Sequence, residues 1–196
     1  MKALAITSES GFPPTPKRWT LEQCDVFREQ GFLQGRYELI EGIIIDKMGQ
    51  SGYHAYLIGI LSDALARLFL SERIRVQTPI RILGELGVWN EPEPDVTVTK
   101  EGRRAYKEEN PSPEDLLLVV EIADSSLRFD LSVKAQLYAQ SGISEYWVLD
   151  VIGRRVIVHR EPTVEGYESV TEWSEGESLS PLALPTSSLA ISDLLG

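Results

Sequence analysis

The sequence has little of what several protein classes require. Its single cysteine, Cys24, excludes a disulfide framework and any site built from several cysteine ligands. No apolar run approaches the roughly 20 residues that span a bilayer. The first ten residues turn polar too early for a signal peptide. We therefore expect a cytoplasmic protein with no membrane partner.

Basic residues are also in short supply, since the formal net charge is -11 at pH 7. This balance argues against simple nucleic-acid binding. The charge is unevenly distributed, however, because residues 161–196 contain seven acidic residues and no lysine or arginine. The rest of the chain holds 19 basic and 23 acidic residues, a net charge of -4. Metal binding by some of these acids would reduce the repulsion further, so a nucleic-acid partner stays possible.

The length of 196 residues suits one domain with a substantial core. Three prolines and a glycine among polar residues predict a flexible arm over residues 1–19, followed by a single domain over residues 20–196. Hydrophobic periodicity and turn residues predict the elements of that domain. We expect helices at 20–31, 53–70 and 128–141, and strands at 37–40, 43–48, 73–83, 95–99, 116–122, 145–151, 155–160, 166–171 and 187–195. Strand runs that alternate with helices predict an α/β fold with a mixed sheet flanked by helices.

Two acidic residues fall at the ends of predicted strands. Glu121 follows the run Leu116–Val120, which has the composition of a strand buried on both faces. A carboxylate there is costly unless it is paired, hydrogen-bonded or bound to a metal, although it could simply face water. Asp95 begins the preceding strand, where it could instead bond its own backbone in a turn. Together the two carboxylates would suit Mg²⁺, which takes one or two carboxylates and retains water.

Lys134 lies on the apolar side of its predicted helix. At about 100° per residue it falls between Leu131, Leu137 and Tyr138, so its side chain is aimed at the sheet. A lysine in this position needs a carboxylate partner or a function, unless it snorkels to the rim or pairs with Asp130 one turn earlier.

Three further residues could reach the same place. Glu38 and Glu41 flank Leu39–Ile40 in the predicted hairpin, where they could also be exposed acids. His54 begins the long helix, where a capping role is the alternative. A basic cluster within the loop 100–113 could contact phosphates or remain solvated.

These residues occur within a longer pattern that resembles a known family. The pattern comprises Tyr37–Gly42, Pro94–Val96, Val120–Ser126, Asp130 with Lys134 and Tyr138, and Gly142–Asp150. It resembles the Uma family of predicted restriction endonucleases, which belongs to the PD-(D/E)xK nuclease superfamily. The match runs from about Trp19 into the tail.

The resemblance implies a restriction-endonuclease-like core and a site for Mg²⁺, which Mn²⁺ would replace. Asp95, Glu121 and the carbonyl of Ile122 would be the metal ligands, and Glu41 would be a further acid of the site. The superfamily lysine two positions after the acidic residue is missing, because Ala123 stands there. The resemblance assigns its role to Lys134.

The sequence thus predicts a Mg²⁺-dependent endonuclease that hydrolyses nucleic-acid phosphodiester bonds, with DNA as the expected partner. One alternative is an inactive nuclease fold that serves as a binding or assembly module. In that case the hairpin with Tyr146 and Trp147 could pack a homodimer. A second alternative is hydrolysis of a small phosphodiester, which needs no basic groove. A homodimer is also compatible with the nuclease hypothesis, because enzymes that cut both strands often pair their sites.

Overall fold

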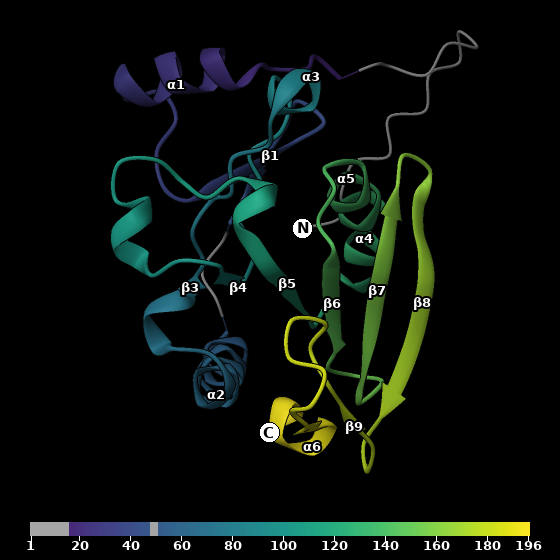
Figure 1. Cartoon of the computed structure of the whole chain (residues 1–196). Coiled ribbons are helices and arrows are strands. Elements are labelled where there is room, and N and C mark those ends of the chain that lie inside the picture. The colour runs from purple at the N-terminus through teal and green to yellow at the C-terminus, as the bar shows by residue number, and fades with distance from the viewer. Residues whose placement is uncertain (1–15, 48–50) are drawn as a thin grey trace, which may run out of the picture.

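The computed structural model describes residues 16–47 and 51–196, and these build a layered arrangement around a six-stranded sheet (Figure 1). The strand order is β3 (Ile74–Val76), β4 (Val96–Thr99), β5 (Leu116–Ala123), β6 (Glu145–Asp150), β7 (Arg155–Thr163) and β8 (Gly166–Ser174). Strands β5 and β6 are parallel, whereas all other neighbours in this sheet are antiparallel. The predicted mixed sheet with flanking helices is confirmed.

One face of the sheet is covered by α2 (Gly52–Leu68) and α6 (Ile191–Leu195), which lie side by side in Figure 1. The periodic apolar residues of α2 are buried there against Val96, Val98 and Val120. Ser51 caps the helix by accepting a hydrogen bond from the backbone N–H of His54. No helix in the described ranges is both long enough and apolar enough to cross a membrane.

The opposite face is covered by one helix that consists of α4 (Leu127–Phe129), a π-helical turn η4 (Asp130–Lys134) and α5 (Ala135–Gln140). Gly142, with φ +79°, follows the helix end as predicted. This helix packs on Val119, Tyr146 and Val148 of the sheet. Tyr146 and Trp147 are both fully buried in the core, so the expectation that their hairpin could pack a homodimer is wrong.

A separate hairpin of β1 (Tyr37–Ile40) and β2 (Ile43–Asp46) packs on the same side as α5. Its two connecting residues, Glu41 and Gly42, have φ values of 50° and 76°. Positive φ at both central positions is the mark of a type I′ turn, which suits the twist of a hairpin. The helix α1 (Leu21–Glu29) begins with a capping box, in which Thr20 and Gln23 each accept the other's backbone N–H.

The ends of the domain differ from the prediction in part. Most of the expected arm lies outside the described residues, but Trp19 already donates its N–H to the carbonyl of Gly42. The expected strand at 187–195 is wrong, because only Leu189–Ala190 (β10) is extended and α6 follows it. Strand β10 pairs with β9 (Ser178–Leu179). The stretch 73–83 contains only the short β3, and the end of the strand predicted at 43–48 lies outside the described residues. Short helical turns complete the chain: η1 (Ser71–Arg73), α3 (Gly84–Gly87), η2 (Arg103–Tyr106) and η3 (Pro113–Asp115).

Candidate active site

Asp95 and Glu121 enter the site from neighbouring strands. Val96 pairs with Val120 as the last pair of the antiparallel ladder of β4 and β5, so Asp95, which directly precedes β4, continues this register toward Glu121. Side chains at directly opposite positions lie on the same face and close together. Both residues are buried, and the backbone N–H of Ile122 donates to Asp95 Oδ2 at 2.9 Å. The register therefore explains why these two carboxylates meet.

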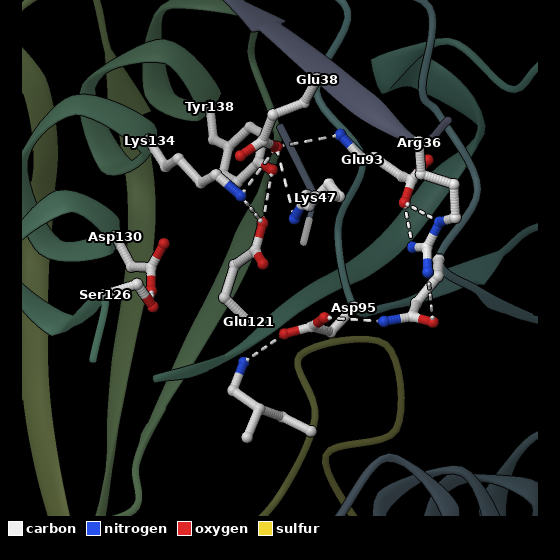
Figure 2. A network of polar contacts seen from close by, with 12 residues as sticks. Arg36, Glu38, Lys47, Glu93, Asp95, Glu121, Ser126, Asp130, Lys134 and Tyr138 are labelled. Atoms are coloured by element: carbon white, nitrogen blue, oxygen red, sulfur yellow. Dashed lines mark hydrogen bonds and ion pairs between the residues drawn. The ribbon is translucent and has the colours of Figure 1, made fainter. Parts of the chain in front are cut away.

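Glu121 is held by two donors on the same oxygen. Lys134 Nζ lies 2.8 Å and the hydroxyl of Tyr138 lies 2.9 Å from Glu121 Oε1 (Figure 2). Burial raises the pKa of Glu121, and the charge of Lys134 acts in the opposite direction. Because both donors use Oε1, Oε2 is left without a hydrogen bond from any described residue. One carboxylate oxygen of Glu121 is therefore available for a further ligand.

Lys134 is buried between two carboxylates. Its ammonium lies 2.8 Å from Glu121 Oε1 and 3.0 Å from Glu38 Oε2. Burial disfavours the charged form, but the two acids outweigh it, so the pKa of Lys134 is raised. The helical wheel correctly places this side chain toward the sheet, and snorkelling is excluded because only 2% of the residue is exposed. Asp130 is not its ion-pair partner and instead accepts a hydrogen bond from Ser126.

Glu38, rather than Glu41, is the hairpin acid that reaches the site. Glu38 Oε2 lies 3.6 Å from Lys47 Nζ and also accepts the backbone N–H of Glu93 at 3.3 Å. The expectation for Glu41 is corrected, because its side chain is exposed in the type I′ turn. Residues in the two-residue turn cannot share the buried strand face that Glu38 occupies.

His54 joins the site through Asp95. Its Nε2 lies 3.1 Å from Asp95 Oδ1, which also accepts a 3.4 Å hydrogen bond from Gln77 Nε2. The hydrogen bond between His54 and Asp95 raises the pKa of His54, against the effect of burial. Burial would raise the pKa of Asp95, but the donors His54 and Ile122 outweigh it and the pKa is lowered. Asp95 is therefore held as a carboxylate at neutral pH.

Asp95, Glu121 and Lys134 line one open cleft of about 520 Å³ at the carboxyl end of β5, together with Glu38, His54 and Gln77, whereas Tyr138 lies behind it. Six acidic residues, three lysines or arginines and His54 line it. The acids are Glu38, Asp46, Asp95, Glu121, Asp124 and Asp130. Among the described residues, no three or more His, Cys, Asp or Glu side chains converge as a ready-made metal site. The cleft thus offers two opposed carboxylates rather than a closed cage.

Two contributors were not recognised as site residues from the sequence. Tyr138 lies on the same apolar face of the helix as Lys134, so the helical wheel could have identified it as well. Gln77 has no comparable signal, because it depends on a backbone with φ 48°, a region that side chains other than glycine rarely adopt.

Comparisons with known proteins agree with this architecture. Residues 27–192 match the family described as "Uma2: Putative restriction endonuclease". Among solved structures, the chain is similar to "a putative nuclease belonging to DUF820" from Anabaena variabilis ATCC 29413, with a TM-score of 0.63 and 16% sequence identity. That similarity covers 86% of this chain and 96% of the other, and at this identity it supports the fold. No curated protein matches the sequence. Because the family model spans most of the chain, the protein belongs to the Uma2 family of restriction-endonuclease-like proteins.

Proposed function

We propose that the protein is a Mg²⁺-dependent endonuclease that hydrolyses phosphodiester bonds of nucleic acid, DNA in the first instance. The observation that carries the proposal is that Asp95, at the start of β4, and Glu121, on β5, line one cleft, with Lys134 Nζ 2.8 Å from Glu121. The nuclease character of the family agrees with it. Charged groups buried in this number at one open cleft are expected at a site of chemistry.

The donor set fits a hard divalent cation. Mg²⁺ binds through one or two carboxylates and keeps several waters, so a closed cage of side chains is not required. Glu121 Oε2 is free of hydrogen bonds from described residues, and Asp95 is held in its ionised form. Asp95, Glu121 and the carbonyl of Ile122 would hold the ion. When bound, it would act as a Lewis acid on a phosphate oxygen and lower the pKa of an attacking water.

The chain's own groups have distinct tasks in this proposal. Lys134 keeps a positive charge beside Glu121, where it offsets the negative charge that develops on the phosphate. Tyr138 fixes the rotamer of Glu121 by donating to Oε1. His54 and Gln77 orient Asp95 from the opposite side of the cleft. Burial of these contacts keeps the acids in place before substrate arrives.

The test is cleavage of plasmid and single-stranded DNA with Mg²⁺ or Mn²⁺, together with calorimetric titration of Mn²⁺. We expect Asp95→Asn and Glu121→Gln to abolish Mn²⁺ binding and cleavage. Lys134→Met should lose cleavage with a smaller effect on binding. The matched control is Glu168→Gln, which neutralises an exposed acid on β8 far along the sheet order from β4.

The outcomes separate the proposal from its alternatives. Cleavage that survives all three substitutions would reject this site. Absence of stoichiometric Mn²⁺ binding to the wild type would favour an inert nuclease fold that serves in binding or assembly. Metal-dependent turnover of a chromogenic phosphodiester, with no action on DNA or RNA, would instead indicate a small-molecule hydrolase.

A further inference from the structure

The mouth of the cleft carries two cations that the proposed chemistry does not use. Arg36 and Lys47 both line the cleft, and they stand immediately before β1 and after β2. The side chain of Arg36 is 44% exposed and that of Lys47 is 23% exposed, compared with 3% for Lys134. Among the described lysines and arginines, these two are therefore the ones that line the cleft and also reach solvent.

The hairpin register brings the two cations together. Tyr37 pairs with Asp46, and the backbone N–H of Lys47 donates to the carbonyl of Arg36 at 2.9 Å. Arg36 and Lys47 are thus directly opposite, and such side chains lie on the same face of a hairpin. Like charges at directly opposite positions destabilise a hairpin, so the pair carries a cost for folding. Glu93 and Glu38 already offset part of this cost, and a ligand of opposite charge would offset more of it.

Each cation is anchored by a buried acid. Arg36 donates to Glu93 and also to Gln77 Oε1 at 3.2 Å, while Lys47 lies 3.6 Å from Glu38 (Figure 2). Glu93 and Glu38 are almost fully buried, so each contacts its cation from the protein interior. These contacts fix the direction of both cations while part of each stays exposed. Gln77 links Arg36 to Asp95, so the cations adjoin the acids of the site.

The acidic lining of the cleft suggests a role for Arg36 and Lys47. Six acids face three lysines or arginines there, and the third cation, Lys134, is enclosed by acids. A nucleic-acid strand carries one negative charge per nucleotide, so it needs local positive charge to approach this surface. We propose that Arg36 and Lys47 form a phosphate subsite, which holds a backbone phosphate of a nucleic-acid strand beside the bond to be cleaved. This inference rests on the proposed function and names the contact that its substrate makes.

The test is binding of a short fluorescein-labelled single-stranded DNA, followed by anisotropy over a range of salt concentrations. The measurements are made with EDTA and with Ca²⁺, so that binding is recorded without turnover. We expect Lys47→Gln to weaken binding several-fold and to reduce the slope of log affinity against log salt by about 0.7, the value for one phosphate contact on a single strand. Arg81→Gln is the matched control, because Arg81 is 49% exposed, pairs with the exposed Glu109 and does not line the cleft.

Arg36 needs a compensated variant, since its loss would leave the buried Glu93 without its cation. The double substitution Arg36→Gln with Glu93→Gln removes both charges, and Arg36→Lys keeps the positive one. We expect the double variant to lose the same salt slope as Lys47→Gln and Arg36→Lys to retain most of it. Circular dichroism and thermal unfolding show whether each variant is folded.

The results distinguish this inference from the proposed function. Weaker, less salt-dependent binding of the variants supports the subsite even if the wild type cleaves nothing. A wild type that cleaves DNA, with variants that bind as tightly as Arg81→Gln and with the same salt slope, overturns the subsite alone. A wild type that neither binds nor cleaves DNA or RNA overturns both.

Discussion

At the scale of single residues, the site depends on pairs of charged groups that could not survive burial alone. Lys134 is ionised because Glu38 and Glu121 surround it, and Glu121 is accommodated because Lys134 and Tyr138 share one of its oxygens. Removing one member of such a set leaves an uncompensated charge, which usually costs more than the intact set contributes. The arrangement is therefore better explained by function than by stability.

Glu38 and Glu41 offer a direct test of this arrangement, because they are the same residue type only three positions apart. We predict that Glu38→Gln lowers Mn²⁺ affinity or cleavage about 10–100-fold, the range found for groups that support metal ligands. Lys134 would then have one acid fewer and would bind Glu121 more strongly. Glu41→Gln should leave both quantities unchanged, since its side chain is exposed. Calorimetry and cleavage rates check the pair, and equal effects of the two substitutions would contradict the placement of Glu38.

The sequence held the information to choose between these two acids. A turn predicted at Glu41-Gly42 already places Glu41 outside both strands, so alternation favours Glu38. Family resemblance pointed to Glu41, whereas the geometry of the type I′ turn excludes it. Lys134 could be predicted because the helical period of about 3.6 residues places it on the apolar face of its helix. The partners of Asp95 were harder to foresee, since Gln77 acts through an unusual backbone conformation.

At the scale of elements, long periodic segments and most short strands agree with the prediction, and the main error lies in the tail. The apolar run of β5 and the periodicity of α2 extend over enough residues to specify their type. The tail from 187 to 195 is a short apolar run, and such runs fit a strand or a buried helix equally well. Tertiary packing decides for the helix, because Ile191, Leu194 and Leu195 fill the core beside α2. The π-helical turn η4 also has no period of its own to detect.

The contribution of α6 can be measured with one substitution. Leu194 is fully buried on the face of the sheet opposite α5. We predict that Leu194→Ala lowers the free energy of unfolding by about 2–5 kcal/mol, from lost burial and the cavity that remains. Leu182→Ala, at a residue 50% exposed, should change it by no more than about 0.5 kcal/mol. Urea denaturation gives both values, and a small effect at Leu194 would show that α6 is not part of the core.

At the scale of the whole molecule, the segment 161–196 stands out because it carries seven acidic residues and no lysine or arginine. Strand β8 lies at one edge of the six-stranded sheet, and all of its residues belong to the acidic segment 161–196. A free edge strand exposes backbone donors and acceptors that can pair with another chain. Exposed charges on such an edge oppose pairing between identical copies. The acidic tail therefore has a structural explanation that is independent of catalysis.

This explanation predicts how self-association responds to charge. We expect Glu165→Gln combined with Glu168→Gln to increase self-association, because Glu168 is exposed on β8, Glu165 is exposed in the turn just before it, and both would lie near like charges in a paired edge. The control is Glu29→Gln combined with Glu85→Gln, which changes the net charge equally at exposed positions outside the sheet. Sedimentation velocity over a range of concentrations measures the effect. Salt near 1 M, where the screening length is about 3 Å, should promote association of the wild type by the same cause. Equal behaviour of the two double variants would mean that total charge, and not the acidic edge, keeps the copies apart.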